Sequence, residues 1–184
     1  MDIASRIDST LLRADARREE IEDLCREART LGFAAVCVNP FRLPLVVSLL
    51  KGSPVAPCTV VAFPLGACSA RDKSREIARA LEQGARELDM VLNIGAIKDQ
   101  DFRLIAGEVS LALREVSSAG AVLKVILETS LLNEREIAEI CKIARGEGVH
   151  FVKTSTGFGP RGATVEDVLL LRECVGTEVG VKAA

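Results

Sequence analysis

Short apolar segments alternate with amphipathic helical segments along the whole chain, and this rhythm constrains the fold more than any other feature. The expected strands cover residues 6–12, 34–40, 58–64, 87–95, 123–129, 151–156 and 180–184. Helical patterns lie between them, over 17–31, 44–51, 71–83, 102–118, 133–145 and 165–174. Strands that are apolar on both sides and are separated by helices predict an α/β fold with a buried parallel sheet. We expect residues 1–184 to form one domain.

The composition of the chain limits the kinds of molecule that it is expected to bind. The net charge of −2 comes from interleaved acids and bases, which argues against a broad surface for nucleic acid or anionic membrane. The sequence has no Trp or Tyr on which single-stranded nucleic acid could stack. No apolar run reaches the roughly 18 residues of a membrane span, and the first residues show no signal peptide. Because the six cysteines form no CxxC and no zinc-ligand spacing, we predict reduced thiols and a cytoplasmic location.

Polar residues recur at the carboxyl ends of the expected strands. They include Asp8, Thr10, Asn39, Asp89, Asn93, Lys124, Glu128, Lys153 and Lys182. Both an open doubly wound sheet and a (β/α)8 barrel place their sites at these ends. An open sheet concentrates its site at one switch point, whereas here nearly every strand contributes. The pattern therefore favours a barrel.

Two lysines in successive strands, Lys153 and Lys182, indicate the chemistry. If both point into the barrel, loss of water and the neighbouring like charge lower the pKa of a lysine. A neutral amine can attack a carbonyl and form an imine. The alternative is that a strand-end lysine extends to water or pairs with Glu128. The residues alone leave both open.

Asp89, in the apolar segment ELDMV, is a second charge in an unexpected place. A carboxylate near an imine can move the proton that aldol chemistry requires. Its alternative is a structural salt bridge with Lys124 or with one of the paired lysines. Asp8 is a weaker candidate, which either orients a substrate hydroxyl or caps the turn that follows it.

Motifs along nearly the whole chain resemble the deoxyribose-phosphate aldolases of the class I, Schiff-base type. In order they are IDSTLL, GFAAVCVNP, CTVVAFPLGA, ELDMVLNIGA, LKVILETSLL, FVKTSTGFG, GATVEDV and GVKA. The resemblance implies a TIM barrel that reversibly cleaves 2-deoxy-D-ribose 5-phosphate to D-glyceraldehyde 3-phosphate and acetaldehyde. It implies a phosphorylated sugar and acetaldehyde as partners, and neither a metal nor an organic cofactor. A homo-oligomer is compatible with it.

The resemblance also implies roles for individual residues. Lys153 would form the imine, Lys182 would tune it and exchange protons, and Asp89 would be the proton-relay carboxylate. Substrate-binding positions would be Asp8, Thr10, Cys37, Thr154 and Gly157. The segment GFGPRG either helps to hold a phosphate through backbone N–H groups or is a Gly-Pro turn.

The sequence departs from the family pattern in two places. Ser9 stands where many relatives have His or Leu, and the family continues after GVKA with a turn, a helix, an eighth strand and a last helix. We therefore expect an incomplete barrel of about seven parallel strands, without the last helix-strand-helix unit. One alternative is a non-catalytic remnant that associates through its open edge. Another is a different lysine-imine aldolase on the same barrel.

Overall fold

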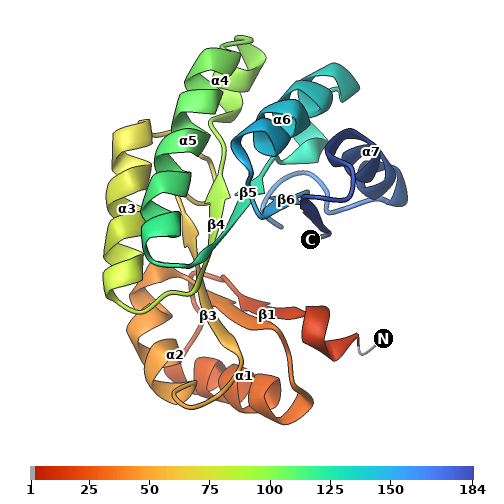
Figure 1. Cartoon of the computed structure of the whole chain (residues 1–184). Helices are drawn as coiled ribbons and strands as arrows, with labels where there is room; N and C mark the ends of the chain where they lie inside the picture. The colour runs from red at the N-terminus through yellow and green to blue at the C-terminus, as the bar shows by residue number, and fades with distance from the viewer. Residues whose placement is uncertain (1–2) are drawn as a thin grey trace.

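The computed structural model describes residues 3–184, which form one parallel sheet with the strand order β1-β2-β3-β4-β5-β6-β7. The strands are β1 Asp8–Leu11, β2 Ala35–Val38, β3 Ala56–Val61, β4 Glu87–Val91, β5 Val122–Ile126, β6 Phe151–Lys153 and β7 Gly180–Lys182. Figure 1 shows the sheet curling around an interior, with β1 and β7 at its two edges. The predicted α/β partial barrel of parallel strands is confirmed.

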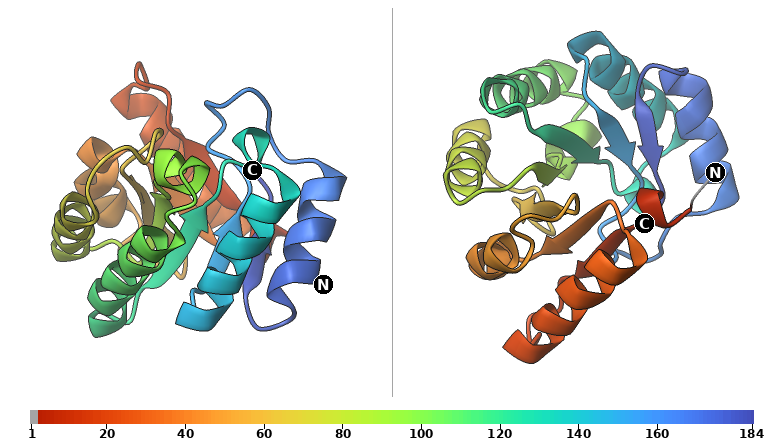
Figure 2. Two further views of the ribbon diagram at one scale, coloured as in Figure 1. Left: turned by 90° about the horizontal axis from the view of Figure 1, so that it is seen from above. Right: turned by 60° about the horizontal axis from the view of Figure 1, so that its bottom comes forward.

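Helices cover the outer face of this half-barrel as an arc (Figure 2). They are α1 Arg18–Leu31, α2 Leu43–Leu49, α3 Ala70–Glu82, α4 Ile94–Lys98, α5 Phe102–Ser118, α6 Glu134–Glu147 and α7 Val165–Val175. Short 3-10 turns lie at Ala4–Arg6, Pro40–Arg42 and Thr129–Leu131. The sequence predicted the capping box that starts α6, where the Asn133 side chain accepts from the Glu136 N–H at 2.9 Å.

All seven strands end earlier than predicted, by one to four residues, at positions 11, 38, 61, 91, 126, 153 and 182. The fourth strand was expected to reach residue 95, but it ends at Val91 because the Asn93 side chain caps the short helix α4, accepting from the Ala96 N–H at 3.1 Å. The sixth strand was expected to reach residue 156, but its ladder with β7 ends at Lys153. The shared error lies at the carboxyl ends of the strands, where the chain turns away to build the mouth of the half-barrel.

Alternation along the strands separates an outer core from an inner one. On β4 and β5 the residues Leu88, Met90, Leu123 and Val125 are buried in the cluster that also includes the helices α3, α5 and α6. The residues between them face the interior. Pairing of Asp89 with Lys124, and of Lys153 with Lys182, therefore brings these charged residues together inside the half-barrel.

Two further observations concern the cysteines and the helices. All six cysteines are free in the structure. Within residues 3–184, no helix combines the length and the apolar character needed to cross a membrane.

Candidate active site

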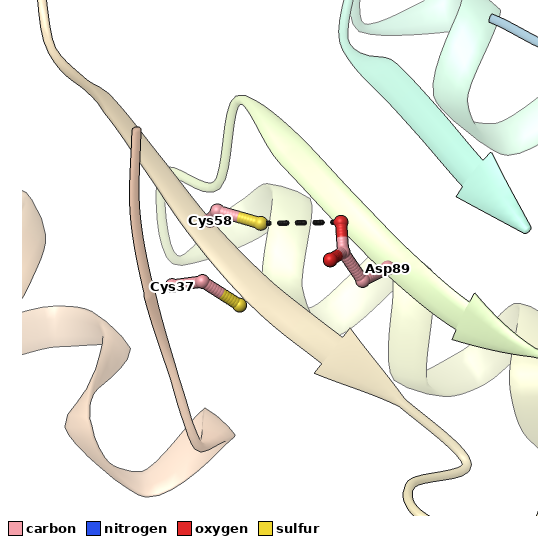
Figure 3. A group of neighbouring side chains, drawn as sticks. All are labelled: Cys37, Cys58 and Asp89. Atoms are coloured by element: carbon pink, nitrogen blue, oxygen red, sulfur yellow. Dashed lines mark hydrogen bonds between the residues drawn. The ribbon is translucent and has the colours of Figure 1, made fainter. Parts of the chain in front are cut away.

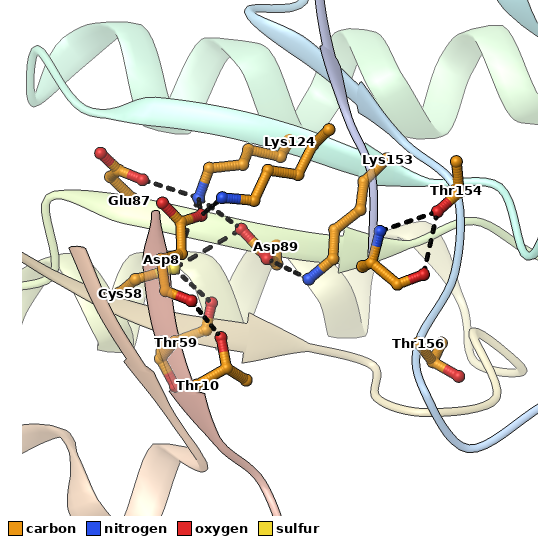
Figure 4. Close-up of polar contacts among 12 residues, drawn as sticks. Asp8, Thr10, Cys58, Thr59, Glu87, Asp89, Lys124, Lys153, Thr154 and Thr156 are labelled. Carbon is orange, nitrogen blue, oxygen red and sulfur yellow. Dashed lines mark hydrogen bonds and ion pairs between the residues drawn. The ribbon is translucent and has the colours of Figure 1, made fainter. Parts of the chain in front are cut away.

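Lys153, at the end of β6, points into the half-barrel and meets Asp89 of β4. Its Nζ lies 2.7 Å from Asp89 Oδ2, and both side chains are almost completely buried (Figure 4). The short strand places the lysine at the mouth, because the chain leaves the sheet directly after it. The ion pair that the sequence offered as an alternative for Asp89 is therefore present, and it joins the two residues predicted to act together.

Lys124 of β5 is the centre of a larger network. Its Nζ lies 2.8 Å from Asp89 Oδ1, 3.1 Å from Asp8 Oδ2 and 2.6 Å from Glu87 Oε2. Asp8 belongs to β1, so the curl of the sheet brings the first strand to the side chain of the fifth. Lys124 thus links three carboxylates from two distant strands.

Lys182 completes the network on the other side of Asp8. Its Nζ lies 2.7 Å from Asp8 Oδ2, and its side chain is 18% exposed. The charges alternate along a continuous line, in the order Lys182, Asp8, Lys124, Asp89 and Lys153. With Glu87, three lysines face three carboxylates, so the interior holds many charges with almost no net charge.

The network determines the protonation of its members. Burial by itself would raise the pKa of Asp89, but the charges of Lys124 and Lys153 outweigh it and lower that pKa to about 2. Burial by itself would lower the pKa of Lys153, but Asp89 outweighs it and raises that pKa. The prediction that Lys153 has a lowered pKa because of Lys182 is therefore wrong for this arrangement, since Lys153 is paired with Asp89 and Lys182 with Asp8.

Cys37 and Cys58 lie beside this network on β2 and β3 (Figure 3). Cys58 Sγ donates to Asp89 Oδ1 at 3.5 Å and lies 3.6 Å from Lys124 Nζ. Its contact with Cys37 and its burial together raise the pKa of Cys58 well above its ordinary value. Cys58 is therefore protonated, and both thiols are fully enclosed.

The remaining predicted positions lie around the mouth. Thr10 is exposed, and its hydroxyl donates to the Asp8 carbonyl at 2.9 Å. Thr154 is buried, and its hydroxyl accepts from the Ala184 N–H at 3.1 Å. Gly157 is exposed and has a φ of 82°, a conformation that favours glycine. The structure does not bring Thr10, Thr154 or Gly157 into the ion network, so their substrate contacts stay a prediction.

Glu128, a potential partner of Lys153 in the sequence, is engaged elsewhere. Its Oε2 accepts from the Thr156 hydroxyl at 2.5 Å and from the Thr156 N–H at 3.2 Å. In the segment GFGPRG, the guanidinium of Arg161 is bound to the carboxylate of Asp167 on α7. The loop after β6 is thus held through Thr156 and Arg161 by carboxylates that lie outside it.

Sequence reasoning missed two members of the site, Glu87 and Cys58. Glu87 lies two residues before Asp89 on the same strand, and Cys58 is its neighbour in the register. The alternation of strand residues carried this signal, because every second residue of a strand shares a face. When one residue on the inner face of a strand is polar, the residues two positions away on that strand are therefore also candidates for the site.

Comparison with known proteins adds a separate line of support. No protein-family model matches the chain. A deoxyribose-phosphate aldolase of Thermoanaerobacter pseudethanolicus is 49% identical over the full chain and over 83% of its own length. Deoxyribose-phosphate aldolase 1 of Bacillus licheniformis is 50% identical over 99% of the chain and 81% of its own length.

A solved structure agrees with the sequence matches. The tetrameric deoxyribose phosphate aldolase of Aeropyrum pernix superposes with a TM-score of 0.91 at 35% identity, over 99% of this chain and 76% of that one. The sequence identity to these relatives is near one half, and the backbone superposes closely on a solved aldolase. Both observations support the same family assignment. The chain belongs to the deoxyribose-phosphate aldolase family and, as predicted, to the aldolases of the lyase class.

Proposed function

We propose that the chain cleaves 2-deoxy-D-ribose 5-phosphate to D-glyceraldehyde 3-phosphate and acetaldehyde through an imine on Lys153. The observation that carries this proposal is the 2.7 Å contact between Lys153 Nζ and Asp89 Oδ2 inside the half-barrel. It supplies a primary amine and a proton acceptor in direct contact, near the carboxyl ends of parallel strands. The relatives named above carry the name of this activity.

The first chemical requirement is a neutral amine. Lys153 is protonated in its ion pair, so a proton must leave before Nζ attacks the aldehyde carbon of the sugar. Asp89 Oδ2 is the group in contact with that proton. Lys124 keeps its own ion pair with Oδ1, so the carboxylate stays oriented while Oδ2 accepts and returns the proton.

The later steps use the same carboxylate. Loss of water from the carbinolamine gives the imine, which draws electrons from the bond between carbons 2 and 3 of the sugar. That bond breaks when the hydroxyl on carbon 3 gives up its proton, and glyceraldehyde 3-phosphate leaves. Protonation of the remaining enamine at carbon 2, followed by hydrolysis, releases acetaldehyde and restores Lys153. Asp89 is our assigned proton carrier for these steps, directly or through a water molecule.

Lys182 and Asp8 form the second half of the proposed machinery. Lys182 lies opposite Lys153 in the strand register, and its Nζ is bound to Asp8 Oδ2 at 2.7 Å. We assign Lys182 the exchange of protons near the imine and Asp8 the orientation of Lys182. Thr10, Cys37, Thr154 and Gly157 stay our candidates for contacts with the substrate around this centre.

Reductive trapping tests the proposal. The chain is incubated with acetaldehyde and borohydride, and the modified lysine is located by peptide mapping. We expect an ethyl group on Lys153, and none on the exposed Lys98, which serves as the internal control for unspecific alkylation. The alternative, a non-catalytic chain, predicts no adduct on Lys153 in a folded sample, and that result would overturn the proposal.

The substrate is tested separately. Deoxyribose 5-phosphate is offered beside longer sugar phosphates, and cleavage is followed by release of the aldehyde products. Preference for a longer sugar would favour a different lysine-imine aldolase. The assembly of the chain is measured by sedimentation, because the relative from Aeropyrum pernix is a tetramer and a homo-oligomer is our expectation here.

A further inference from the structure

Cys37, Cys58 and Asp89 form a compact group of metal-ligating atoms inside the half-barrel (Figure 3). Their two Sγ atoms and a carboxylate oxygen all lie within 4.8 Å of one another. The residues come from the successive strands β2, β3 and β4, and Cys37 and Cys58 are partners in the register. All three are 0% exposed, so the sheet itself fixes the spacing of the group.

The distance between Cys58 and Asp89 suits a tetrahedral metal ion. Bonds of about 2.3 Å to sulfur and about 2.0 Å to oxygen separate a sulfur ligand from an oxygen ligand by about 3.5 Å. Cys58 Sγ lies 3.5 Å from Asp89 Oδ1. A metal ion bound to both atoms would replace the hydrogen bond that Cys58 Sγ donates to Asp89 Oδ1.

We propose that Cys37, Cys58 and Asp89 form a binding site for a thiophilic divalent cation of the zinc class. On binding, each thiol loses its proton, and the cation gains two thiolates and one carboxylate oxygen, with the fourth position left to water. Two protons leave as one dication enters, so the net charge of the interior does not change. This balance matters because the surrounding lysines and carboxylates already compensate one another.

The cation would oppose the proposed reaction rather than serve it. Asp89 is the carboxylate that holds Lys153 at 2.7 Å. A cation bound to Asp89 withdraws negative charge from that contact and removes a proton acceptor from the imine-forming lysine. This inhibitory consequence depends on the proposed function, whereas the binding of the metal does not.

The chain contains a matched control for the site. Cys141 and Cys174, on α6 and α7, also contact each other through their thiols. Among the residues that the structure describes, they are not part of a group of three or more potential ligands. Among the described residues, both cysteine pairs therefore bring two thiols together, but the pair Cys37 and Cys58 also has a buried carboxylate beside it.

Cadmium titration of the reduced full-length chain tests the proposal. Cadmium reports each thiolate through its sulfur-to-metal absorption in the ultraviolet, and proton release is measured in the same titration. We expect one tight site with two thiolates and two protons released. In Cys58→Ser, which keeps the size of the side chain, we expect the affinity to fall at least about tenfold, because two of the three protein ligands cannot hold the ion alone. The double variant Cys141→Ser/Cys174→Ser should bind as the original chain does.

Two results would overturn the metal site. One is equal binding by the original chain and Cys58→Ser, and the other is loss of the tight site in Cys141→Ser/Cys174→Ser. Sugar cleavage by the original chain, measured with and without cadmium, then tests the inhibition, which should follow occupancy of the tight site and persist in Cys141→Ser/Cys174→Ser. If the chain shows no cleavage at all, the proposed function fails, while the cadmium titration still decides whether the site exists.

Discussion

Two buried lysine–carboxylate pairs lie on opposite faces of the sheet. Lys153 and Asp89 meet inside the half-barrel, whereas Lys73 of α3 and Glu108 of α5 meet outside it, 2.8 Å apart, with both side chains 0% exposed. Lys73 Nζ also donates to the Val91 carbonyl at 2.7 Å, at the end of β4. The two pairs have the same chemistry and similar distances.

Their surroundings differ. The outer pair consists of one lysine and one carboxylate, and burial, outweighing the charge of Lys73, raises the pKa of Glu108. Inside, Asp89 has two lysines, and its pKa is lowered to about 2. The outer pair lies between helices and sheet and fastens α3 and α5 to β4, while the inner pair lies near the ends of the strands. A buried charge therefore indicates a site only when its position in the fold gives a substrate access to it.

Removal of the inner lysine should have the largest effect on activity. Lys153→Met deletes the proposed nucleophile, and we expect cleavage of deoxyribose 5-phosphate to fall by about 10⁴-fold or more. The fold should persist, because Asp89 keeps its contact with Lys124 at 2.8 Å. The measurement is kcat/KM with a coupled assay for glyceraldehyde 3-phosphate, beside chemical unfolding of the same sample. Activity within tenfold of the original chain would contradict the assignment of Lys153.

Removal of the outer lysine should affect stability instead. Lys73→Met leaves the Glu108 carboxylate buried without a cation, which costs about 3–5 kcal/mol of unfolding free energy. The folded fraction should retain kcat/KM within a few-fold, since Lys73 does not reach the interior. The double variant Lys73→Met/Glu108→Leu is the control, and it should recover most of the stability. Loss of activity without loss of stability would show that the outer pair acts on the site.

The two carboxylates should also respond oppositely to pH. Asp89 binds its proton less readily in the folded chain, so its contribution is present above about pH 4 and is lost as the pH falls from 3.8 towards 2, at a cost of about 2 kcal/mol. Glu108 binds its proton more readily in the folded chain, so its contribution is present at low pH and is lost as the pH rises. Urea unfolding from about pH 2 to about pH 7 should give a flatter slope below pH 3.8 for Asp89→Asn, and a stability that rises more steeply with pH above 4.5 for Glu108→Gln. Equal slopes in all three chains would contradict the opposite pKa directions.

The sequence reveals the inner pair more readily than the outer one. Lys153 and Asp89 interrupt strands that are otherwise apolar, so their presence was visible, and their common face followed from the barrel prediction. Lys73 and Glu108 lie in helical patterns rich in charged residues, where a lysine is ordinarily solvated. Nothing local distinguishes them, because their burial results from the packing of α3 on α5.

Contacts across the curl of the sheet also could not be predicted from local sequence patterns. Asp8 and Lys124 lie on strands far apart in the sheet order, and their 3.1 Å contact depends on how strongly the sheet bends. The pKa of Lys153 was predicted in the wrong direction for the same reason. Its nearest charge is Asp89, and Lys182 is bound by Asp8, a partner that the strand register alone does not supply.

The smallest change in unfolding free energy is expected at an exposed lysine–carboxylate pair. Lys98 Nζ lies 2.8 Å from Glu136 Oε2, but the lysine side chain is 48% exposed. Because water solvates the lysine well without its partner, Lys98→Ala should cost less than about 1 kcal/mol. Glu136→Ala should cost more, by about 1 kcal/mol, since Glu136 Oε2 also accepts from the Asn133 N–H at 2.8 Å in the cap of α6. Chemical unfolding at low and high salt measures both. Only the part due to Lys98 should decrease with salt, because ions screen an exposed charge and leave the capping hydrogen bond in place. A cost for Lys98→Ala as large as that for Lys73→Met would mean that burial does not separate these pairs.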